Sequence, residues 1–316
     1  MEKILITGGC GYVGTVLTQS LLSKGHEIII IDTEWFGNYL PYHNNLTCYK
    51  KNTSEITMSD LAGVDRVIHL ANIANDPAVD LDQVLSWEVN VLSTMQLIEK
   101  CVRIQSVKQF VFASSGSVYG VKSEPKVTED LMLVPISAYN KTKMIAEKVL
   151  KSYAGEILIH NIRPATVCGL SPRMRLDVAV NLLTFQALKK GKITVLGGDQ
   201  TRPNIHIMDM VAVYEHFLEK SQCLPSGEYN AGFENISILE IAQLIQNHIP
   251  CEIEIKPSND PRSYRQDSTK LLDSGFIPKY SVEHAILEIK RAYESGELIE
   301  SPLNYTIETM KNIVVQ

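Results

Sequence analysis

The chain has 316 residues, of which 45% are apolar, so it can bury a large hydrophobic core, and general disorder is excluded. Its 30 lysines and arginines against 36 aspartates and glutamates give a formal net charge of −6, which argues against a protein built mainly to coat nucleic acid. No apolar run approaches the roughly 20 residues that cross a bilayer, and the chain starts with a strand pattern rather than a leader. We therefore expect a cytoplasmic protein with neither a membrane nor a nucleic-acid partner.

The cysteines are scattered along the chain and form no CxxC pair and no cluster with histidine. They are Cys10, Cys48, Cys101, Cys168, Cys223 and Cys251. Disulfide frameworks and zinc sites need closer and more regular spacings. We expect reduced thiols and no metal site.

The first half of the chain alternates short apolar runs with longer segments of helical period. The expected strands are 3–7, 27–31, 46–50, 66–70, 109–113 and 156–162, and the expected helices are 12–23, 84–102 and 138–153. This alternation is typical of parallel strands joined by right-handed crossover helices. It predicts an α/β fold with a doubly wound parallel sheet of the Rossmann type.

After Pro164 the rhythm changes. Helical patterns cover 178–190, 210–219, 238–248 and a final helix at 282–295, and shorter strand patterns cover 193–196, 204–207 and 228–230. These segments do not continue the regular strand and helix alternation. We therefore expect a second, smaller α+β lobe.

A glycine-rich turn follows the first expected strand. Gly8, Gly11 and Gly14 are spaced three apart, with Tyr12 and Val13 between the last two, and the next helix begins here. Glycine permits a left-handed backbone, close approach of a diphosphate to main-chain amides, and tight packing of the helix on the strand. The turn therefore predicts a dinucleotide site.

Asp32 lies at the end of the second expected strand, where a carboxylate can accept hydrogen bonds from the adenosine ribose hydroxyls. The same carboxylate would repel a 2′-phosphate, and no arginine follows closely. The pair of signals favours NAD over NADP as the cofactor.

Tyr139 and Lys143 are four residues apart in the helix expected after Ser137, so they project from the same face. A neighbouring ammonium and the positive nicotinamide ring favour a phenolate, which would lower the pKa of Tyr139 toward neutral pH. Ser115 follows the fifth expected strand. Because ligands bind beyond the carboxyl ends of the strands in a doubly wound sheet, these three side chains and the glycine turn can face one crevice.

Taken together, these residues resemble the extended short-chain dehydrogenase/reductases, and within them the NAD-dependent nucleotide-sugar epimerases and dehydratases. The resemblance rests on the GGxGxxG turn, Asp32, residues 65–71, Asn90 and Val91 with Thr94, residues 115–120, Tyr139, Lys143, Arg163 and Pro164, residues 171–173, Arg202 and Pro203 before His206 and Asp209, and residues 260–264 before Lys270. It covers nearly the whole chain. It implies an NAD-binding domain formed by 1–170 and 205–235 and a nucleotide-sugar-binding lobe formed by 171–204 and 236–316.

The resemblance implies roles for the catalytic residues. Tyr139 is expected to remove the proton of the sugar C4 hydroxyl as hydride passes from C4 to the nicotinamide. Lys143 is expected to hold the nicotinamide ribose and to tune Tyr139, and Ser115 to orient the substrate oxygen.

The resemblance also implies binding residues. On the cofactor side they are Leu70, Ala71, Asn90 and Pro164; on the substrate side they are Ser117, Thr166, Arg202, Arg262 and Tyr264. Arg202 is the best match to the arginine that holds the substrate diphosphate, and Arg262 and Tyr264 are weaker matches. Thr166 stands where related epimerases have an asparagine, which puts that contact in question.

The residues after Ser115 bear on the reaction. Dehydratases of the family carry an Asp-Glu pair there, whereas this chain has Gly116 and Ser117, so 4,6-dehydration is disfavoured. What remains is 4-epimerisation through a 4-keto sugar or, as an alternative, net C4 oxidation or reduction of a nucleotide-linked hexose or heptose, for example GDP-heptose, for surface polysaccharide synthesis. A non-catalytic NAD-binding regulator is a lesser alternative. The resemblance further implies a homodimer packed through the helices 84–102 and 138–153.

Two groups of residues keep two interpretations each. Trp35, Phe36 and Tyr39 either cover the adenine and the site rim or belong to an ordinary surface loop. Arg173 and Arg175 either clamp an anionic ligand or are solvated.

Overall fold

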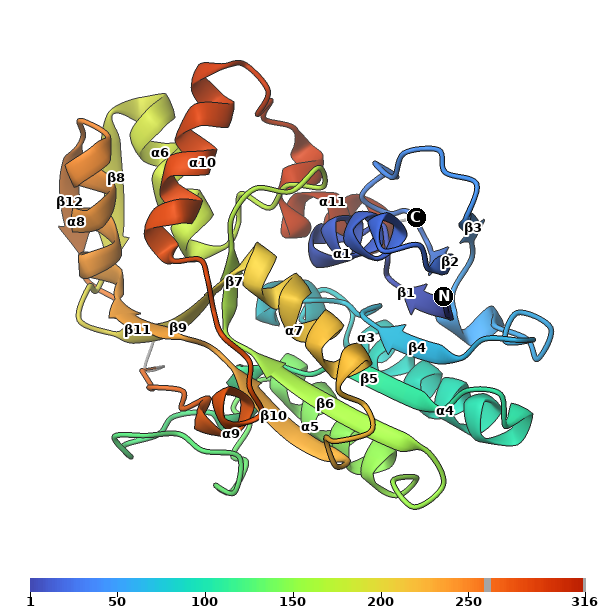
Figure 1. Ribbon diagram of the computed structural model, residues 1–316. Coiled ribbons are helices and arrows are strands. Elements are labelled where there is room, and N and C mark those ends of the chain that lie inside the picture. Colours follow the sequence, from blue (N-terminus) through green and yellow to red (C-terminus); the bar gives the residue numbers. More distant parts are fainter. Residues whose placement is uncertain (259–262, 315–316) are drawn as a thin grey trace.

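The protein is built around a seven-stranded sheet, shown in Figure 1 from a computed structural model that describes residues 1–258 and 263–314. Its strands are β1 (Lys3–Thr7), β2 (Glu27–Asp32), β3 (Leu46–Lys50), β4 (Arg66–His69), β5 (Gln109–Ala113), β6 (Leu158–Pro164) and β10 (Gly227–Ala231). They lie in the order β10-β6-β5-β4-β1-β2-β3, and all neighbours are parallel. The chain winds outward from β1 in both directions, which confirms the predicted doubly wound fold.

Helices cover both faces of this sheet. On one face α1 (Tyr12–Ser23) and α7 (Ile207–Glu219) enclose a core with β1 and β2, and on the other α4 (Ser93–Ile104) and α5 (Ala138–Lys151) enclose a second core. Strand β2 reads EIIIID because its central isoleucines are buried on both faces.

The helix expected over 84–102 is not continuous. The chain forms α3 (Gln83–Trp87), then a π-helical turn, η2 (Glu88–Leu92), and then α4. Asn90 lies in η2, where its side-chain oxygen accepts a hydrogen bond from Ile73 N at 2.8 Å and its Nδ2 donates to Ile73 O at 3.1 Å. Hydrophobic periodicity alone does not reveal such a local widening of the helix.

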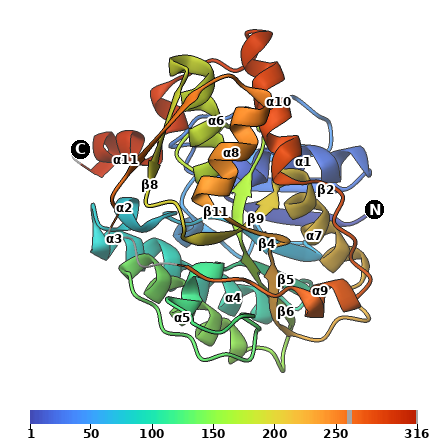
Figure 2. The ribbon, with the colours of Figure 1, turned by 90° about the vertical axis from the view of Figure 1, so that its left-hand side faces the viewer.

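Beyond β6 the chain builds a second group of elements, at the upper left of Figure 1 and the top of Figure 2. Strands β7 (Thr166–Cys168), β9 (Thr201–His206) and β11 (Glu234–Ser237) form one small sheet, and β8 (Lys192–Leu196) pairs with β12 (Glu252–Lys256). Helices α6 (Ala179–Lys190), α8 (Ile238–His248) and α10 (Val282–Glu294) enclose the core of this region. The division of the chain expected at 170, 205 and 235 stays a prediction.

A C-terminal helix, α11 (Thr306–Val314), was not expected from the sequence. Figure 2 shows it beside α2 (Asp76–Val79), and its Met310 is buried with Ile73, Ala78 and Val79. The spacing of Ile307, Met310 and Ile313 was an available helical signal. The remaining short elements are η1 (Thr53–Glu55), η3 (Gly116–Tyr119), η4 (Pro302–Asn304) and α9 (Thr269–Asp273).

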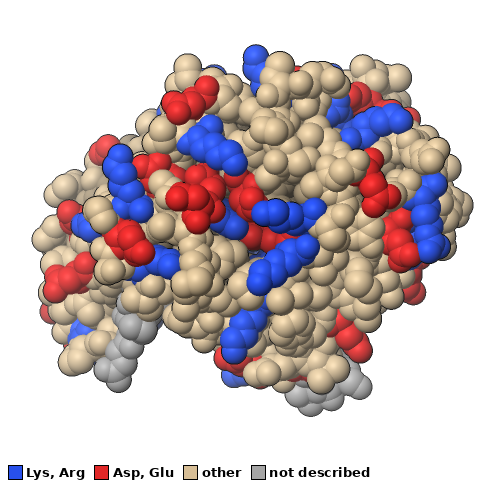
Figure 3. All heavy atoms as spheres, turned by 90° about the horizontal axis from the view of Figure 1, so that it is seen from below, with Lys and Arg blue, Asp and Glu red and all other residues tan. Residues whose placement is uncertain are grey.

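The surface and the helices add two observations. On the face seen in Figure 3, basic and acidic side chains are interspersed rather than separated by sign. Within residues 1–258 and 263–314, no helix is both long and apolar enough to cross a bilayer, and no group of three or more His, Cys, Asp and Glu side chains is placed to hold a metal ion.

Candidate active site

A cavity of about 750 Å³ lies beyond the carboxyl ends of the central strands. Of the residues predicted for the site, it is lined by Gly8, Gly11, Tyr12, Val13, Gly14, Asp32, Leu70, Ala71, Ser115, Ser117, Tyr139, Lys143, Pro164, Thr166, Arg202 and Tyr264. These residues come from the seven-stranded sheet with its helices and from the second group of elements. Parallel strands bring their ends to one edge, so segments far apart in sequence meet there.

The glycine turn has the geometry that its sequence predicts. Gly8 has a φ of +72°, and a Cβ there would lie 2.6 Å from Ala71 N. A Cβ on Gly14 would lie 2.4 Å from Gly8 O. Larger side chains would therefore separate the turn from β4 and push α1 away from the strand.

Asp32 closes the next edge of the cavity. Its two carboxylate oxygens accept hydrogen bonds from Cys10 N at 3.0 Å and Glu34 N at 2.7 Å, which fix the side chain beside the glycine turn. Burial raises the pKa of Asp32, and these two hydrogen bonds oppose that shift. The carboxylate can still accept from a ribose hydroxyl, because each oxygen has two lone pairs.

Asn90 differs from the expectation. It is 1% exposed and lies behind the cavity wall, where it holds both the N–H and the C=O of Ile73 and donates to Thr142 Oγ1 at 3.2 Å. Its contacts position the segment that follows Ala71 rather than line the cavity. Arg262 lies outside the described residues.

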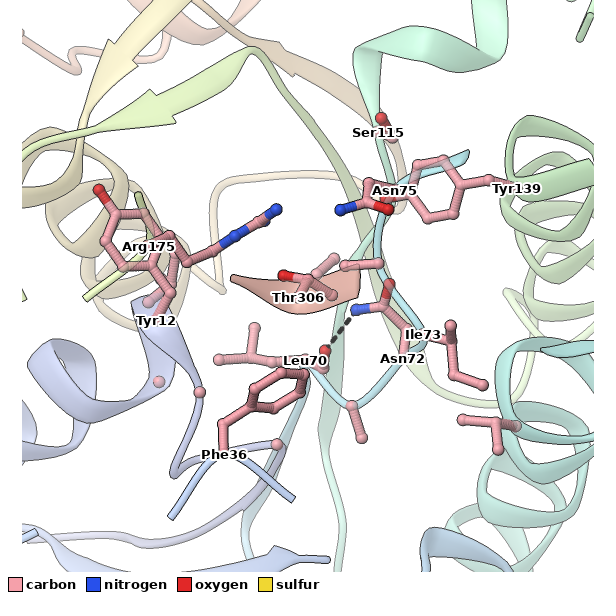
Figure 4. Close-up of a pocket in the computed structure, with 18 of the residues that line it drawn as sticks. Tyr12, Phe36, Leu70, Asn72, Ile73, Asn75, Ser115, Tyr139, Arg175 and Thr306 are labelled. Atoms are coloured by element: carbon pink, nitrogen blue, oxygen red, sulfur yellow. Dashed lines mark hydrogen bonds between the residues drawn. The ribbon is translucent and has the colours of Figure 1, made fainter. Parts of the chain in front are cut away.

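Tyr139 and Ser115 lie on the same side of the cavity (Figure 4). Burial raises the pKa of Tyr139 to about 12, while the Ser115 hydroxyl and the charge of Arg175 lower it. The expected lowering toward neutral pH is thus not seen in the protein alone, because desolvation outweighs the neighbouring cation.

Lys143 is 1% exposed, and its ammonium group donates to Ala113 O at 2.6 Å. It lies 4.8 Å from the centre of the Phe112 ring. Burial lowers the pKa of Lys143 to about 7, against an opposing effect of Glu147. The ammonium is therefore held at the end of β5, one helical turn from Tyr139.

A buried ion pair fixes the helix that carries both residues. Glu147 lies one turn beyond Lys143. Its carboxylate accepts hydrogen bonds from Arg163 Nε at 3.0 Å and Nη2 at 2.7 Å, and from the Ser114 hydroxyl. Both side chains are at most 4% exposed. Because bidentate pairs are directional, this contact sets the position of α5 against β5 and β6.

The structure adds cavity residues that sequence reasoning left open or missed. Figure 4 shows Arg175 extending across the cavity toward Asn75, which has a φ of +73°. Arg175 Nε donates to Asp177 Oδ1 at 2.8 Å, and the Asp177 Oδ2 accepts from Thr306 N at 2.8 Å. Thr306 and Met310 bring α11 into the wall. Trp35 and Phe36 also line the cavity, whereas Tyr39 is not among the lining residues.

The cavity suits an adenine dinucleotide at its glycine-turn end. The N-terminus of α1 carries no side-chain cap, so its first amides are open to an anion, and Asp32 lies beside them. A buried Arg173 Nε without a hydrogen-bond partner belongs to the same wall. An anionic diphosphate would accept hydrogen bonds from the amides and the arginine, and a ribose would donate to Asp32.

Comparison with known proteins agrees with this geometry. Residues 4–232 match the NAD dependent epimerase/dehydratase family. The chain is 33% identical over 290 residues to an uncharacterised UDP-glucose epimerase, YtcB, of Bacillus subtilis (strain 168), covering 81% of this chain and 88% of that protein. It is 26% identical to a UDP-glucose 4-epimerase of Lactobacillus helveticus, covering 88% and 92%.

A solved structure shares the fold over nearly the whole chain. The UDP-glucuronic acid 4-epimerase of Bacillus cereus, crystallised with UDP-glucuronic acid and NAD, is 28% identical with a TM-score of 0.81. The match covers 92% of this chain and 100% of that one.

Proposed function

The chain belongs to the NAD dependent epimerase/dehydratase family, and from that membership we propose that it is an NAD-dependent nucleotide-sugar 4-epimerase acting through a 4-keto sugar. One observation carries the proposal. Tyr139, Lys143 and Ser115 line the same cavity as the glycine turn and Asp32, so a bound dinucleotide and a sugar carbinol can meet there.

In this proposal two side chains act on the C4 hydroxyl of the sugar. Ser115 holds the C4 oxygen, and Tyr139 accepts its proton and later returns it. Bound NAD would supply the acceptor and donor of the C4 hydride and the positive charge of its oxidised ring. The pKa of Tyr139 must fall from about 12 for this step, and the cations placed to lower it are Arg175, whose charge already does so, and Lys143 on the same helix face.

The substrate diphosphate needs cations at the opposite end of the cavity. We assign this role to Arg202, with Tyr264 as a further contact, since both line the cavity from the second group of elements. Thr166 and Ser117 also line the cavity. In this assignment they contact the sugar.

The carboxylates of the wall argue for epimerisation rather than 4,6-dehydration. Among the described lining residues the carboxylates are Asp32, Glu88 and Asp177. Asp32 is held beside the glycine turn, Glu88 is an exposed residue of η2, and Asp177 is paired with Arg175. None of them follows Ser115, where an acid and base for elimination would be needed.

The first prediction tests the reaction. Purified protein incubated with a panel of UDP-, GDP-, dTDP- and CDP-sugars is expected to convert at least one of them into its C4 epimer, identified by NMR. Tyr139→Phe is expected to retain fold and cofactor binding and to lower kcat by about 100-fold or more, because the ring stays and the proton acceptor is lost.

The absorbance of reduced nicotinamide separates the alternatives. An epimerase returns the hydride, so reduced cofactor stays below one equivalent per enzyme. Continuous accumulation with added NAD would identify a C4 dehydrogenase, and turnover equal to wild type in Tyr139→Phe would require a different base. Cofactor binding without turnover of any sugar would favour a regulator.

We further propose a homodimer. An apolar groove runs along the outside of α3, η2 and α4 and is lined by Gln83, Val84, Trp87, Glu88, Val91, Leu92 and Met95. Val84 is 71% exposed there. A second copy of the chain would remove this apolar surface from water. A cytoplasmic location and a place in polysaccharide synthesis complete the proposal.

A further inference from the structure

A buried arginine that forms no salt bridge with a described residue lies in the wall of the cavity. Arg173 is 4% exposed, and its Nε has no hydrogen-bond partner. No ion pair of Arg173 occurs within the described part of the chain. A buried cation is costly unless a negative group compensates it. Its burial therefore indicates a ligand that supplies a direct anionic contact.

Its surroundings place Arg173 at the cofactor end of the cavity. The guanidinium carbon lies 4.1 Å from the centre of the Phe36 ring, and Phe36 lies on the segment that follows Asp32. The charge of Arg173 lowers the pKa of Asp32 against the larger effect of burial, so the two side chains face a common region. Arg175, by contrast, extends toward Asn75 (Figure 4).

The segment that carries Arg173 is fixed to the start of α1. Ser171 Oγ donates to Tyr12 O at 2.8 Å, and Tyr12 OH donates to Gly169 O at 2.7 Å. Asn181 Nδ2 donates to the hydroxyl oxygen of Tyr12 at 3.0 Å. These contacts bring the arginine to the helix end that follows the glycine turn.

We propose that Arg173 is a cofactor-binding residue that holds the diphosphate of the dinucleotide from the side opposite the glycine turn. The inference rests on the proposed function, because it requires NAD in this cavity. The Asp32 carboxylate lies in the same region and would repel a 2′-phosphate, which favours the diphosphate as the anion that Arg173 binds. A cofactor held from both sides would stay bound between accepting hydride from the sugar and returning it, as an epimerase without net redox change requires.

The second prediction is a binding experiment on protein stripped of nucleotide. Arg173→Met is expected to weaken NAD and ADP-ribose by about 10- to 100-fold in calorimetric titration, the loss of one charge-assisted contact. Adenosine, which has no phosphate, is expected to bind both proteins within about twofold. Arg173→Lys should fall between them, since it keeps the charge and loses the planar stacking on Phe36.

Two further measurements separate ligand binding from a structural role. The cofactor-free Arg173→Met protein is expected to melt at the wild-type temperature or above it, because an uncompensated buried charge is removed and the apolar stem is kept. A merely structural arginine would lower it. The matched control is Arg103→Met on α4, whose side chain is 69% exposed, and which should bind NAD as wild type does.

Three outcomes contradict the inference. Equal NAD affinity in wild type and Arg173→Met would overturn it while leaving the proposed function intact. A loss confined to NADP and 2′-phospho-ADP-ribose would assign the arginine to a 2′-phosphate and refute the diphosphate assignment. A wild-type protein that binds neither NAD nor ADP-ribose would refute the proposed function and the inference with it.

Discussion

At the scale of single residues, Lys143 is the side chain whose proposed catalytic role comes at the expense of stability. Its ammonium donates to Ala113 O, and burial holds its pKa at about 7, whereas an unfolded lysine titrates near 10.5. Desolvation is the larger effect, and the charge of Glu147 opposes it only in part.

The third prediction follows from this difference in pKa. Below about pH 7 both states carry the charge, so the folded protein bears the full desolvation penalty. Between about pH 7 and 10.5 the unfolded state binds more protons, so this lysine makes the protein more stable as pH rises. Lys143→Met should therefore raise the melting temperature of the cofactor-free protein most at pH 6 and progressively less toward pH 10.

The measurement is a set of thermal melts of both proteins across that range. A melting-temperature difference that is independent of pH between 6 and 10 would mean that Lys143 is not a desolvated cation. Such a result would also weaken its assignment as the group that tunes Tyr139.

At the scale of elements, α11 adds a part of the cavity wall that the sequence did not predict. It starts at Thr306, whose N–H donates to Asp177, and that aspartate also holds Arg175 in the cavity. One carboxylate thus connects the C-terminal helix to a cation that extends across the cavity. Burial raises the pKa of Asp177, but Arg175 and Thr306 outweigh it and bring the pKa below its usual value.

The fourth prediction separates the two roles of Asp177. Asp177→Asn keeps an acceptor for Thr306 N but loses the charge that holds Arg175, so it should raise KM for the sugar nucleotide several-fold with little change in melting temperature. Asp177→Ala loses both contacts, which at about 1–3 kcal/mol should also lower the melting temperature by a few degrees. Kinetics and thermal melts on both variants provide the check. Identical behaviour of the two variants would show that charge and anchoring are not separable here.

On the scale of the whole molecule, the exposed groove of α3, η2 and α4 is the surface on which the proposed dimer rests. Trp87 is 37% exposed in it although it is one of only two tryptophans in the sequence. Large aromatic side chains are enriched in the buried centres of interfaces.

The fifth prediction is that the wild-type protein has twice the 35.3 kDa chain mass by light scattering, and that Trp87→Glu shifts it toward the monomer. A charge buried at an interface without a partner is costly enough to dissociate a dimer of moderate affinity. Ile299→Glu, at a position 76% exposed on the second group of elements, is the matched control and should leave the mass unchanged. A wild-type monomer would contradict the dimer.

The amino-acid sequence by itself determined the fold class and the dinucleotide end of the cavity. The period of apolar residues predicted β1, β2 and α1, and the glycine spacing with Asp32 predicted the dinucleotide end, because these signals are local: strand burial, a positive φ at Gly8 and a helix N-terminus each involve a few consecutive residues. The matched family membership agrees with that interpretation.

Only the tertiary structure decided which distant groups share the cavity. Arg173 lies in the cavity wall because its loop is hydrogen-bonded to Tyr12, and Arg175 lies there because Asp177 holds it. Helix α11 reaches the wall because its Met310 packs against α2. The raised pKa of Tyr139 is of the same kind, since it depends on what surrounds the phenol rather than on its neighbours in sequence. Burial and electrostatics are set by contacts between residues far apart in the chain, which no local pattern records.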